Sequence, residues 1–216
     1  MFRHGCDVLT LGDHVWDQKE LEAYLDQTDR VIRPANFPNG VPGKGYCVHE
    51  AHNGIKIAVV NLIGRVFMKH LVDSPFDRLE KILQEIKKET SVIIVDFHAE
   101  TTSEKMTIGH LSDGKVSAVV GTHTHIQTCD EKVLPKGTAY ITDLGMSGPY
   151  DSEIGQNKEA IIKRFLTSMP FRFQVAKDDV ELHGVVIDID EKSGKARSIQ
   201  RIGQEYRPSH SKAETS

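Results

Sequence analysis

Residues 119–128 read VVGTHTHIQT: an apolar pair, a glycine, and then two histidines separated by one residue. Small and apolar residues at 117–120 predict the end of a buried strand just before the histidines. Side chains at positions i and i+2 of a strand point the same way, so His123 and His125 are expected to converge on one place. Neutral imidazole is the commonest metal ligand in proteins. For such a pair taken alone, an exposed strand tip is the competing interpretation.

The segments around this stretch alternate between strand and helix patterns. Strands are predicted at 7–14, 55–65, 91–100, 114–125 and 137–145, helices at 17–27, 75–90 and 158–167, and an antiparallel run at 171–177, 181–190 and 196–203. This order predicts an α/β layered sandwich, with two mixed sheets flanked by helices. We expect a single domain over residues 1–203 and a polar tail over residues 204–216.

Composition excludes several classes of protein. The net charge of the 216 residues is −4, so no basic excess exists to neutralise the phosphates of a nucleic acid. No apolar run approaches the roughly 20 residues that a membrane span needs, and the N-terminus has no secretory pattern. Cys6, Cys47 and Cys129 are far apart and odd in number, which disfavours a disulfide framework or a cysteine zinc site. We therefore expect a cytoplasmic protein that does not bind a membrane.

Three of the predicted strands end in side chains of the metal-binding type. Asp13 and His14 end the first strand, His98 ends the strand at 91–100, and His123 and His125 end the strand at 114–125. In open α/β sheets, ligands bind beyond the carboxyl ends of the strands. A single strand that ends in histidine can be explained by exposure of that end to solvent. Three strand ends that together carry one carboxylate and four imidazoles predict a metal site instead.

These residues follow the order found in a known superfamily. Gly12-Asp13-His14, the lone His98 and the block GTHTH at 121–125 resemble the calcineurin-like metallophosphoesterases. The longer blocks LGDHVWDQKE, RPANFPNGVPGKG, VDFHAETTSEK and LPKGTAYITDLGMSGPYDS resemble the bacterial YmdB-type phosphodiesterases. The resemblance implies a metallophosphoesterase sandwich and metal-dependent hydrolysis of phosphodiesters such as 2′,3′-cyclic nucleotides.

The resemblance also implies roles for single residues. His98 and His123 match ligands of one metal, Asp13 stands where the family usually has a ligand asparagine, and His125 matches a ligand of a second metal. His14 matches the histidine that assists at the leaving oxygen. Two metals can clamp the attacking and leaving oxygens of an in-line displacement, and a neighbouring histidine can protonate the departing alkoxide. We expect two divalent or trivalent ions as cofactors, iron or manganese first and zinc also possible.

The sequence departs from the family pattern in two ways. Asp13 adds a negative charge where the family has a neutral asparagine, so it should hold a metal more tightly. The family also begins with two further strands, ending in Gly-Asp and in Asn-x-Glu-Asn, which find no match here. We therefore expect an N-terminally incomplete domain, with bare strand edges that favour a homo-oligomer.

Two other functions stay open. A shortened family member would bind a metal or a nucleotide with weak turnover or none, because the glutamate that bridges the two metals has no match here. The amidohydrolases also carry His-x-His at a strand end, but on their first strand and with further histidines downstream. His123 and His125 come last among the strand-end histidines here, which disfavours that class.

Overall fold

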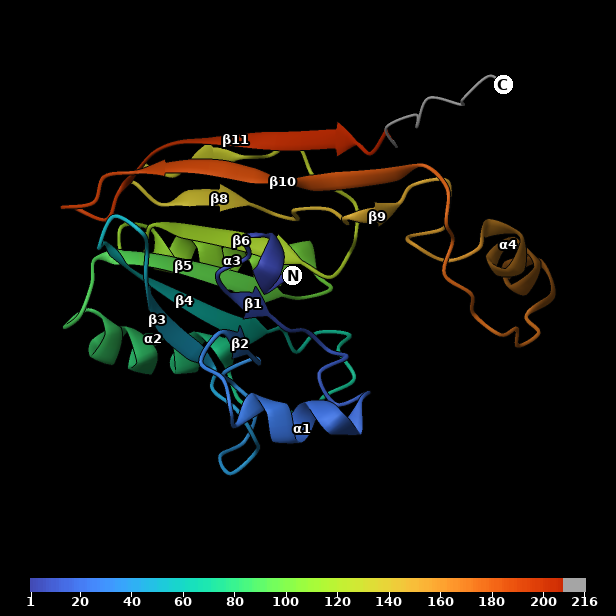
Figure 1. The fold of residues 1–216 in the computed structure, drawn as a ribbon, viewed down its shortest axis with the longest axis horizontal. Helices are drawn as coiled ribbons and strands as arrows, with labels where there is room; N and C mark the ends of the chain where they lie inside the picture. The colour runs from blue at the N-terminus through green and yellow to red at the C-terminus, as the bar shows by residue number, and fades with distance from the viewer. Residues whose placement is uncertain (208–216) are drawn as a thin grey trace, which may run out of the picture.

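A six-stranded mixed sheet forms the centre of the computed structural model, which describes residues 1–207 (Figure 1). Its strands in spatial order are β3 (Tyr46–Glu50), β4 (Lys56–Ile63), β5 (Val92–His98), β6 (Ala118–Thr122), β8 (Ala139–Ile141) and β7 (Lys132–Val133). The four inner strands are parallel, and the two edge strands pair antiparallel to their neighbours. The carboxyl ends of β4, β5 and β6 therefore meet at one edge of the sheet.

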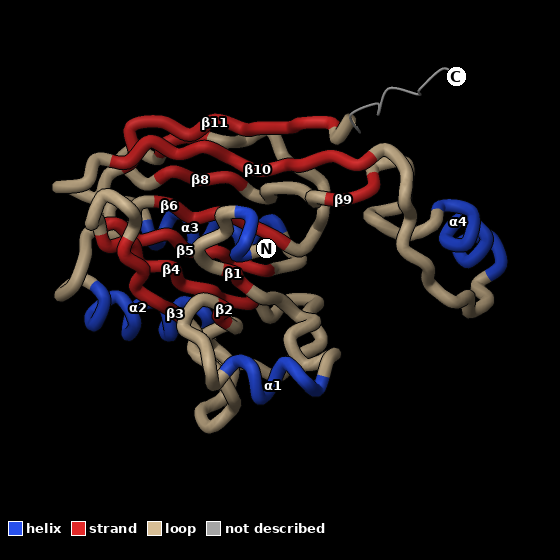
Figure 2. The backbone as a smooth tube through the Cα atoms, viewed as in Figure 1, coloured by secondary structure: helices blue, strands red, loops and turns tan. Residues whose placement is uncertain are grey.

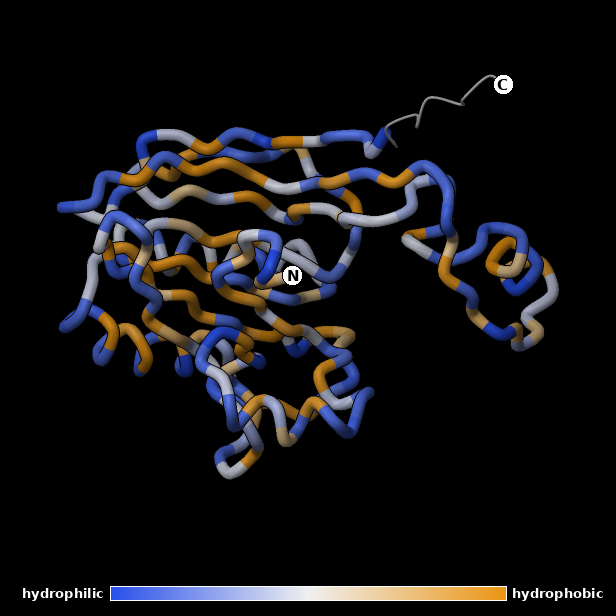
Figure 3. The backbone as a smooth tube through the Cα atoms, viewed as in Figure 1, coloured by the Kyte–Doolittle hydropathy of each residue, from blue (hydrophilic) through white to orange (hydrophobic). Residues whose placement is uncertain are grey.

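Helices α2 (Pro75–Ile86) and α3 (Thr102–Ser112) pack on one face of this sheet and build the main core with it. Ile93, Val95 and Phe97 of β5 belong to that core. Successive side chains of a strand alternate between faces, so Asp96 and His98 lie on the opposite face. Figure 3 shows the hydrophobic residues concentrated along these central strands.

A second, antiparallel sheet covers the other face. It contains β9 (Gly148–Pro149), β10 (Val180–Ile189) and β11 (Ala196–Glu205). Small alanines of β6, β8 and β11 let the two sheets approach closely, and Ile94, Ile187 and Ile199 pack around them. The layers are therefore helix, sheet and sheet, which confirms the expected α/β sandwich.

The N-terminal segment forms a third, smaller layer that the sequence did not predict as a separate sheet. β1 (Leu9–Thr10) pairs in parallel with β2 (Val31–Ile32), and the segment also carries a 3₁₀ helix, η1 (Phe2–His4), and α1 (Lys19–Leu25). Buried Asn61 of β4 joins this layer to the main sheet, because its side-chain amide donates to the carbonyls of Leu11 and Ile32. The short parallel pair thus fixes where the residues after β1 meet the carboxyl edge of the main sheet.

The structure corrects three local predictions. Helix α3 was not predicted, because Glu104 and Lys105 occupy its buried side and no apolar stripe marks it. The segment 171–177 is not a strand, and only Val175 forms an isolated bridge, with Gln156. The last strand runs to Glu205, two residues into the expected tail, and residues 208–216 of that tail lie outside the described part.

Helix α4 (Lys158–Thr167) projects from the layered body, connected to it by two loop stretches (Figure 2). None of its residues is buried, and Phe165 is 82% exposed. Within residues 1–207, no helix has both the length and the apolar character that crossing a membrane demands.

Candidate metal centre

Three of the five predicted site residues meet at the carboxyl edge of the main sheet. Asp13, His98 and His123 each place one ligand atom within 4.8 Å of the others. The Nε2 atom of His98 lies 3.0 Å from Oδ1 of Asp13 and 3.1 Å from Nδ1 of His123. The Nδ1 atom of His123 lies 3.6 Å from the same carboxylate oxygen. Residues from three distant parts of the chain thus form one compact group.

Strand geometry explains why His98 reaches this point. It is the last residue of β5 and pairs in register with Thr122, the last residue of β6. Its imidazole lies directly on Gly12, where an added Cβ atom would sit 2.2 Å from Cε1 of the ring. A glycine before Asp13 is therefore required for the carboxylate and the imidazole to share one site.

The outer nitrogen of each histidine has its own acceptor. Thr122 Oγ1 donates to Asp96 at 2.8 Å, so it can only accept from Nδ1 of His98, 3.1 Å away. The Nε2 atom of His123 lies 3.0 Å from a carboxylate oxygen of Glu100 and donates to it. Such outer partners fix the tautomer of ligand histidines in metal sites. The two inner nitrogens are left unprotonated, facing the carboxylate of Asp13.

This inward arrangement fits a cation. Two nitrogen lone pairs and a carboxylate oxygen repel one another at 3.0–3.6 Å unless a positive charge lies among them. Ligand atoms about 2.0–2.2 Å from a tetrahedral ion lie about 3.3–3.6 Å apart, close to the separations found. Mixed imidazole and carboxylate ligands suit zinc, manganese or iron better than calcium.

The electrostatics keep these groups in the form that binds metal. Burial lowers the pKa of His98 to about 4, against the opposing contact with Asp13, so the imidazole is neutral at neutral pH. Burial would raise the pKa of Asp13, but protons on the neighbouring imidazoles, that of His98 first, lower this pKa below its ordinary value. Metal binding requires neutral histidine and ionised carboxylate.

His14 lies beside the group and outside it. Its Nε2 atom is 3.8 Å from Oδ1 of Asp13, and its side chain is 75% exposed. The Nδ1 atom donates to Asp17 at 2.6 Å, so Asp17 orients this imidazole. The N-cap of α1 is Gln18, so Asp17 does not cap that helix.

Within the described residues 1–207, His125 is not part of the group formed by Asp13, His98 and His123. Its Nδ1 atom lies 2.9 Å from the carbonyl oxygen of Ile154. The expected convergence of the two histidines fails because the backbone leaves the strand conformation. His123 has φ 99° and His125 has φ 67°, so the alternation of β6 ends at Thr122.

A buried ion pair holds the turn that carries both histidines. The carboxylate of Asp143 accepts from the backbone N–H of Thr124 at 3.1 Å and from its hydroxyl at 2.7 Å. Lys105 of α3 donates to the same oxygen at 2.8 Å, and both side chains are at most 2% exposed. Sequence reasoning missed this pair, because Lys105 lies in the unpredicted helix and Asp143 in an ordinary strand-end segment.

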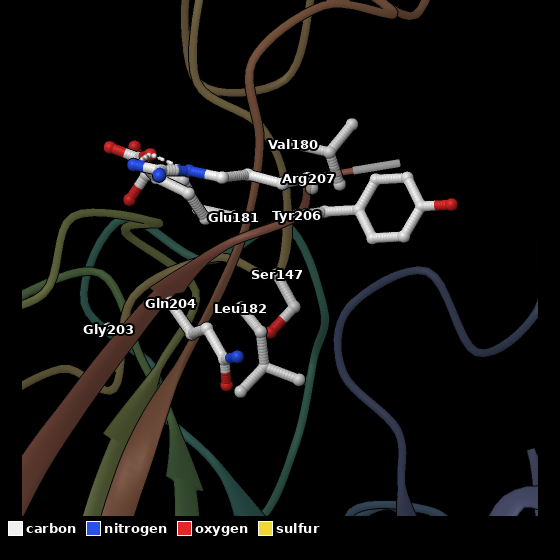
Figure 4. Close-up of a pocket in the computed structure, with 10 residues that line it drawn as sticks. Ser147, Val180, Glu181, Leu182, Gly203, Gln204, Tyr206 and Arg207 are labelled. Carbon is white, nitrogen blue, oxygen red and sulfur yellow. Dashed lines mark hydrogen bonds and ion pairs between the residues drawn. The ribbon is translucent and has the colours of Figure 1, made fainter. Parts of the chain in front are cut away.

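A groove of about 930 Å³ lies between the ends of β9, β10 and β11 (Figure 4). Its lining includes Ser147, Val180, Glu181 and Tyr206 and none of the five predicted site residues. The candidate metal centre therefore lies outside this groove.

Comparison with known proteins agrees with this geometry. A family described as "YmdB-like protein" matches residues 1–202. A Bacillus subtilis protein named 2′,3′-cyclic-nucleotide 2′-phosphodiesterase is 52% identical over 202 residues, covering 94% of this chain and 76% of that protein.

Two solved structures share the fold. A Thermus thermophilus protein described as hypothetical superposes with a TM-score of 0.88 at 40% identity, covering 95% of this chain and 79% of its own. A Mycoplasma pneumoniae protein described as a novel phosphatase superposes with a TM-score of 0.86 at 35% identity. The match covers 94% of this chain and 74% of that protein's chain. The expected enzyme class, a phosphodiester hydrolase, is confirmed at the level of the family. From its sequence and its fold alike, the chain belongs to the YmdB-like family.

Proposed function

We propose that this chain hydrolyses phosphodiesters, with 2′,3′-cyclic nucleotides as its substrate class, at the centre formed by Asp13, His98 and His123. The observation that carries the proposal is the convergence of three ligand atoms, with an acceptor already present for the outer nitrogen of each of the two histidines. The name of the Bacillus subtilis relative supports the substrate class.

The chain's own residues divide the work as follows. Asp13, His98 and His123 would hold one ion, which would polarise a phosphoryl oxygen and supply a nucleophilic hydroxide at neutral pH. His14, held at Nδ1 by Asp17, presents Nε2 to the space beside Asp13 and in its protonated form gives a proton to the departing oxygen. Asp96 and Glu100 keep the two ligand imidazoles in the required tautomers.

We further propose a second ion with His125 as one ligand. His125 follows His123 by two residues and lies on the same turn, which Asp143 holds through the backbone N–H of Thr124. Iron or manganese fits the mixed donor set first, and zinc is the third choice. A metal-binding or nucleotide-binding protein with weak turnover or none is the alternative function.

One experiment separates these functions. The purified chain, loaded with manganese or iron, is assayed on 2′,3′-cyclic AMP and bis-p-nitrophenyl phosphate, and its metal content is measured by elemental analysis. If the wild-type chain hydrolyses these substrates and both His98→Ala and His123→Ala lose hydrolysis and bound metal together, the result supports the proposed enzymatic function. His110→Ala, an exposed histidine on α3, is the matched control and should keep both. Full metal content without hydrolysis would establish the alternative, and full metal content in both variants would refute the site.

We also propose a cytoplasmic setting and a homo-oligomer. Cys6, Cys47 and Cys129 are all free thiols, as a reducing compartment allows. Exposed apolar side chains on the projecting helix α4, Phe165 and Leu166, support association between copies. Light scattering coupled to gel filtration should find more than one chain per particle, and Phe165→Ser with Leu166→Ser should reduce that number.

A further inference from the structure

The loop that follows β4, residues 64–73, carries an aromatic ring that packing does not explain. Phe67 is 87% exposed, although burial of a phenylalanine ring is favourable. Its φ is 61°, in the left-handed region that bulky residues rarely adopt. Exposed side chains on strained backbone are found preferentially at functional sites.

Contacts tie this loop to the candidate metal centre from both ends. The backbone N–H of Gly64 donates to the carbonyl of His98 at 2.9 Å. At the other end, Nε2 of His70 lies 2.6 Å from the carbonyl oxygen of Asp13 and donates to it. The Nζ atom of Lys69 lies 3.8 Å from the Asp13 carboxylate. The loop therefore begins beside one ligand and returns to another, with Phe67 between them.

The start of the loop is rigidly held. The buried carboxylate of Glu104 accepts from the backbone N–H groups of Arg65 at 3.1 Å and Val66 at 3.0 Å. Phe67 follows these two anchored residues directly. A ring presented on such an anchor loses little freedom when a ligand stacks on it.

A hollow of about 630 Å³ lies along the same loop, lined by Arg65, Val66, Met68, His70, Leu71 and Phe76 among others. Its volume falls in the range of about 300–1,000 Å³ that is typical of small-molecule sites. The lining combines apolar side chains with the guanidinium of Arg65 and the carboxylates of Asp73 and Glu104. Of its lining residues, His70 contacts the backbone of Asp13, whereas neither Phe67 nor a candidate metal ligand lines the hollow.

We propose that the loop 64–73 is the nucleoside subsite of the enzyme, with the ring of Phe67 stacking on the base and Lys69 facing the phosphodiester. This inference rests on the proposed function for its substrate class. It adds a determinant of specificity, because stacking on one aromatic side chain favours a nucleotide over a phosphodiester that lacks a base. Removal of a stacking side chain weakens binding by about 5–100-fold per base.

The test compares Phe67→Ala and Phe67→Trp with the wild-type chain. The substrates are 2′,3′-cyclic AMP and the base-free methyl riboside 2′,3′-cyclic phosphate. Phe67→Ala should raise the ratio of the two KM values, cyclic AMP over base-free, by about 5–100-fold, and Phe67→Trp should restore it. Phe173→Ala, which removes an exposed ring outside this loop, is the matched control and should leave the ratio as it is.

Binding measurements keep this inference separate from the proposed function. Calorimetry with adenosine 2′-monophosphate and with inorganic phosphate decides the subsite even if no substrate is hydrolysed. A selective loss of adenosine 2′-monophosphate affinity in Phe67→Ala supports it. An equal loss for both probes, no loss for either, or a change in oligomeric state with unchanged affinity would overturn it, the last by showing that Phe67 contacts a second copy.

Discussion

Replacing Asp143 by asparagine should destabilise the fold more than replacing any charged residue on the surface by a neutral one. One carboxylate oxygen of Asp143 accepts from Lys105 and twice from Thr124, and the other accepts from the backbone N–H of Gly145 at 2.8 Å. In either orientation, the NH₂ group of an asparagine would face a donor. In both orientations the buried ammonium of Lys105 would lose its counter-charge.

The size of the effect follows from the burial of the pair. Removing one partner of a buried ion pair costs about 3–5 kcal/mol, because the other charge is left uncompensated. For a chain of this size, each kcal/mol lowers Tm by about 2–4 °C, so Tm should fall by about 6–20 °C. Lys105→Met should cost less, since the carboxylate keeps its other three donors.

Urea denaturation of the metal-free chain measures the free energy of unfolding. A manganese titration measures the affinity for manganese of the centre that includes His123. Asp130→Asn is the matched control, because Asp130 accepts from the backbone N–H and hydroxyl of Thr142 but contacts no lysine. If Asp143→Asn cost no more unfolding free energy than Asp130→Asn, the ion pair would not be holding this part of the fold.

Three further predictions follow from the site and from one surface turn. Gly12→Ala should abolish metal binding while keeping all three ligands, because the new Cβ would occupy the place of the His98 ring; elemental analysis showing full metal content would contradict it. His14→Ala should keep the metal and lower kcat by about 10²–10⁴-fold, as expected for loss of a general acid, and a parallel loss of metal would instead make His14 a ligand. Asp190, which accepts from the N–H and hydroxyl of Ser193 and pairs with Arg197, should titrate by NMR with a pKa of about 2. Because this pKa lies below the value of the unfolded chain, its contribution to stability is full above about pH 4 and is lost as the pH falls toward 2; Ser193→Ala should raise the pKa, and an unshifted value in the wild type would disprove the contacts.

The sequence predicted the central strands and helices well, because their apolar patterns match the faces that they bury. The stripe of α2 and the runs of β4, β5 and β6 are examples. It could not predict α3, whose inner side contributes Lys105 to an ion pair in place of an apolar stripe. It also overextended the strand that ends in GTHTH, since the alternation rule assumes extended backbone. Two left-handed histidines break that assumption.

For the site, residue type and position at strand ends indicated Asp13, His14, His98, His123 and His125. The family resemblance then singled out Asp13, His98 and His123, which the structure places as neighbours. The partners that fix their tautomers depend on the register between β5 and β6, which places Thr122 beside His98. Because β5 and β6 are parallel and joined by a crossover through α3, no tight turn in the sequence reveals their register. The clamp by Asp143 likewise joins residues that lie 19 positions apart in sequence.

Because Asp13, His98 and His123 come from three separate parts of the chain, an ion that all three hold can bind only after the layers have assembled. Such an ion favours the folded chain by mass action, by about 2.7 kcal/mol when its free concentration is 100 times its Kd. The trace metal in a buffer is then a component of every melting curve recorded for this protein. Two preparations of identical sequence would melt at different temperatures if one had been dialysed against a chelator.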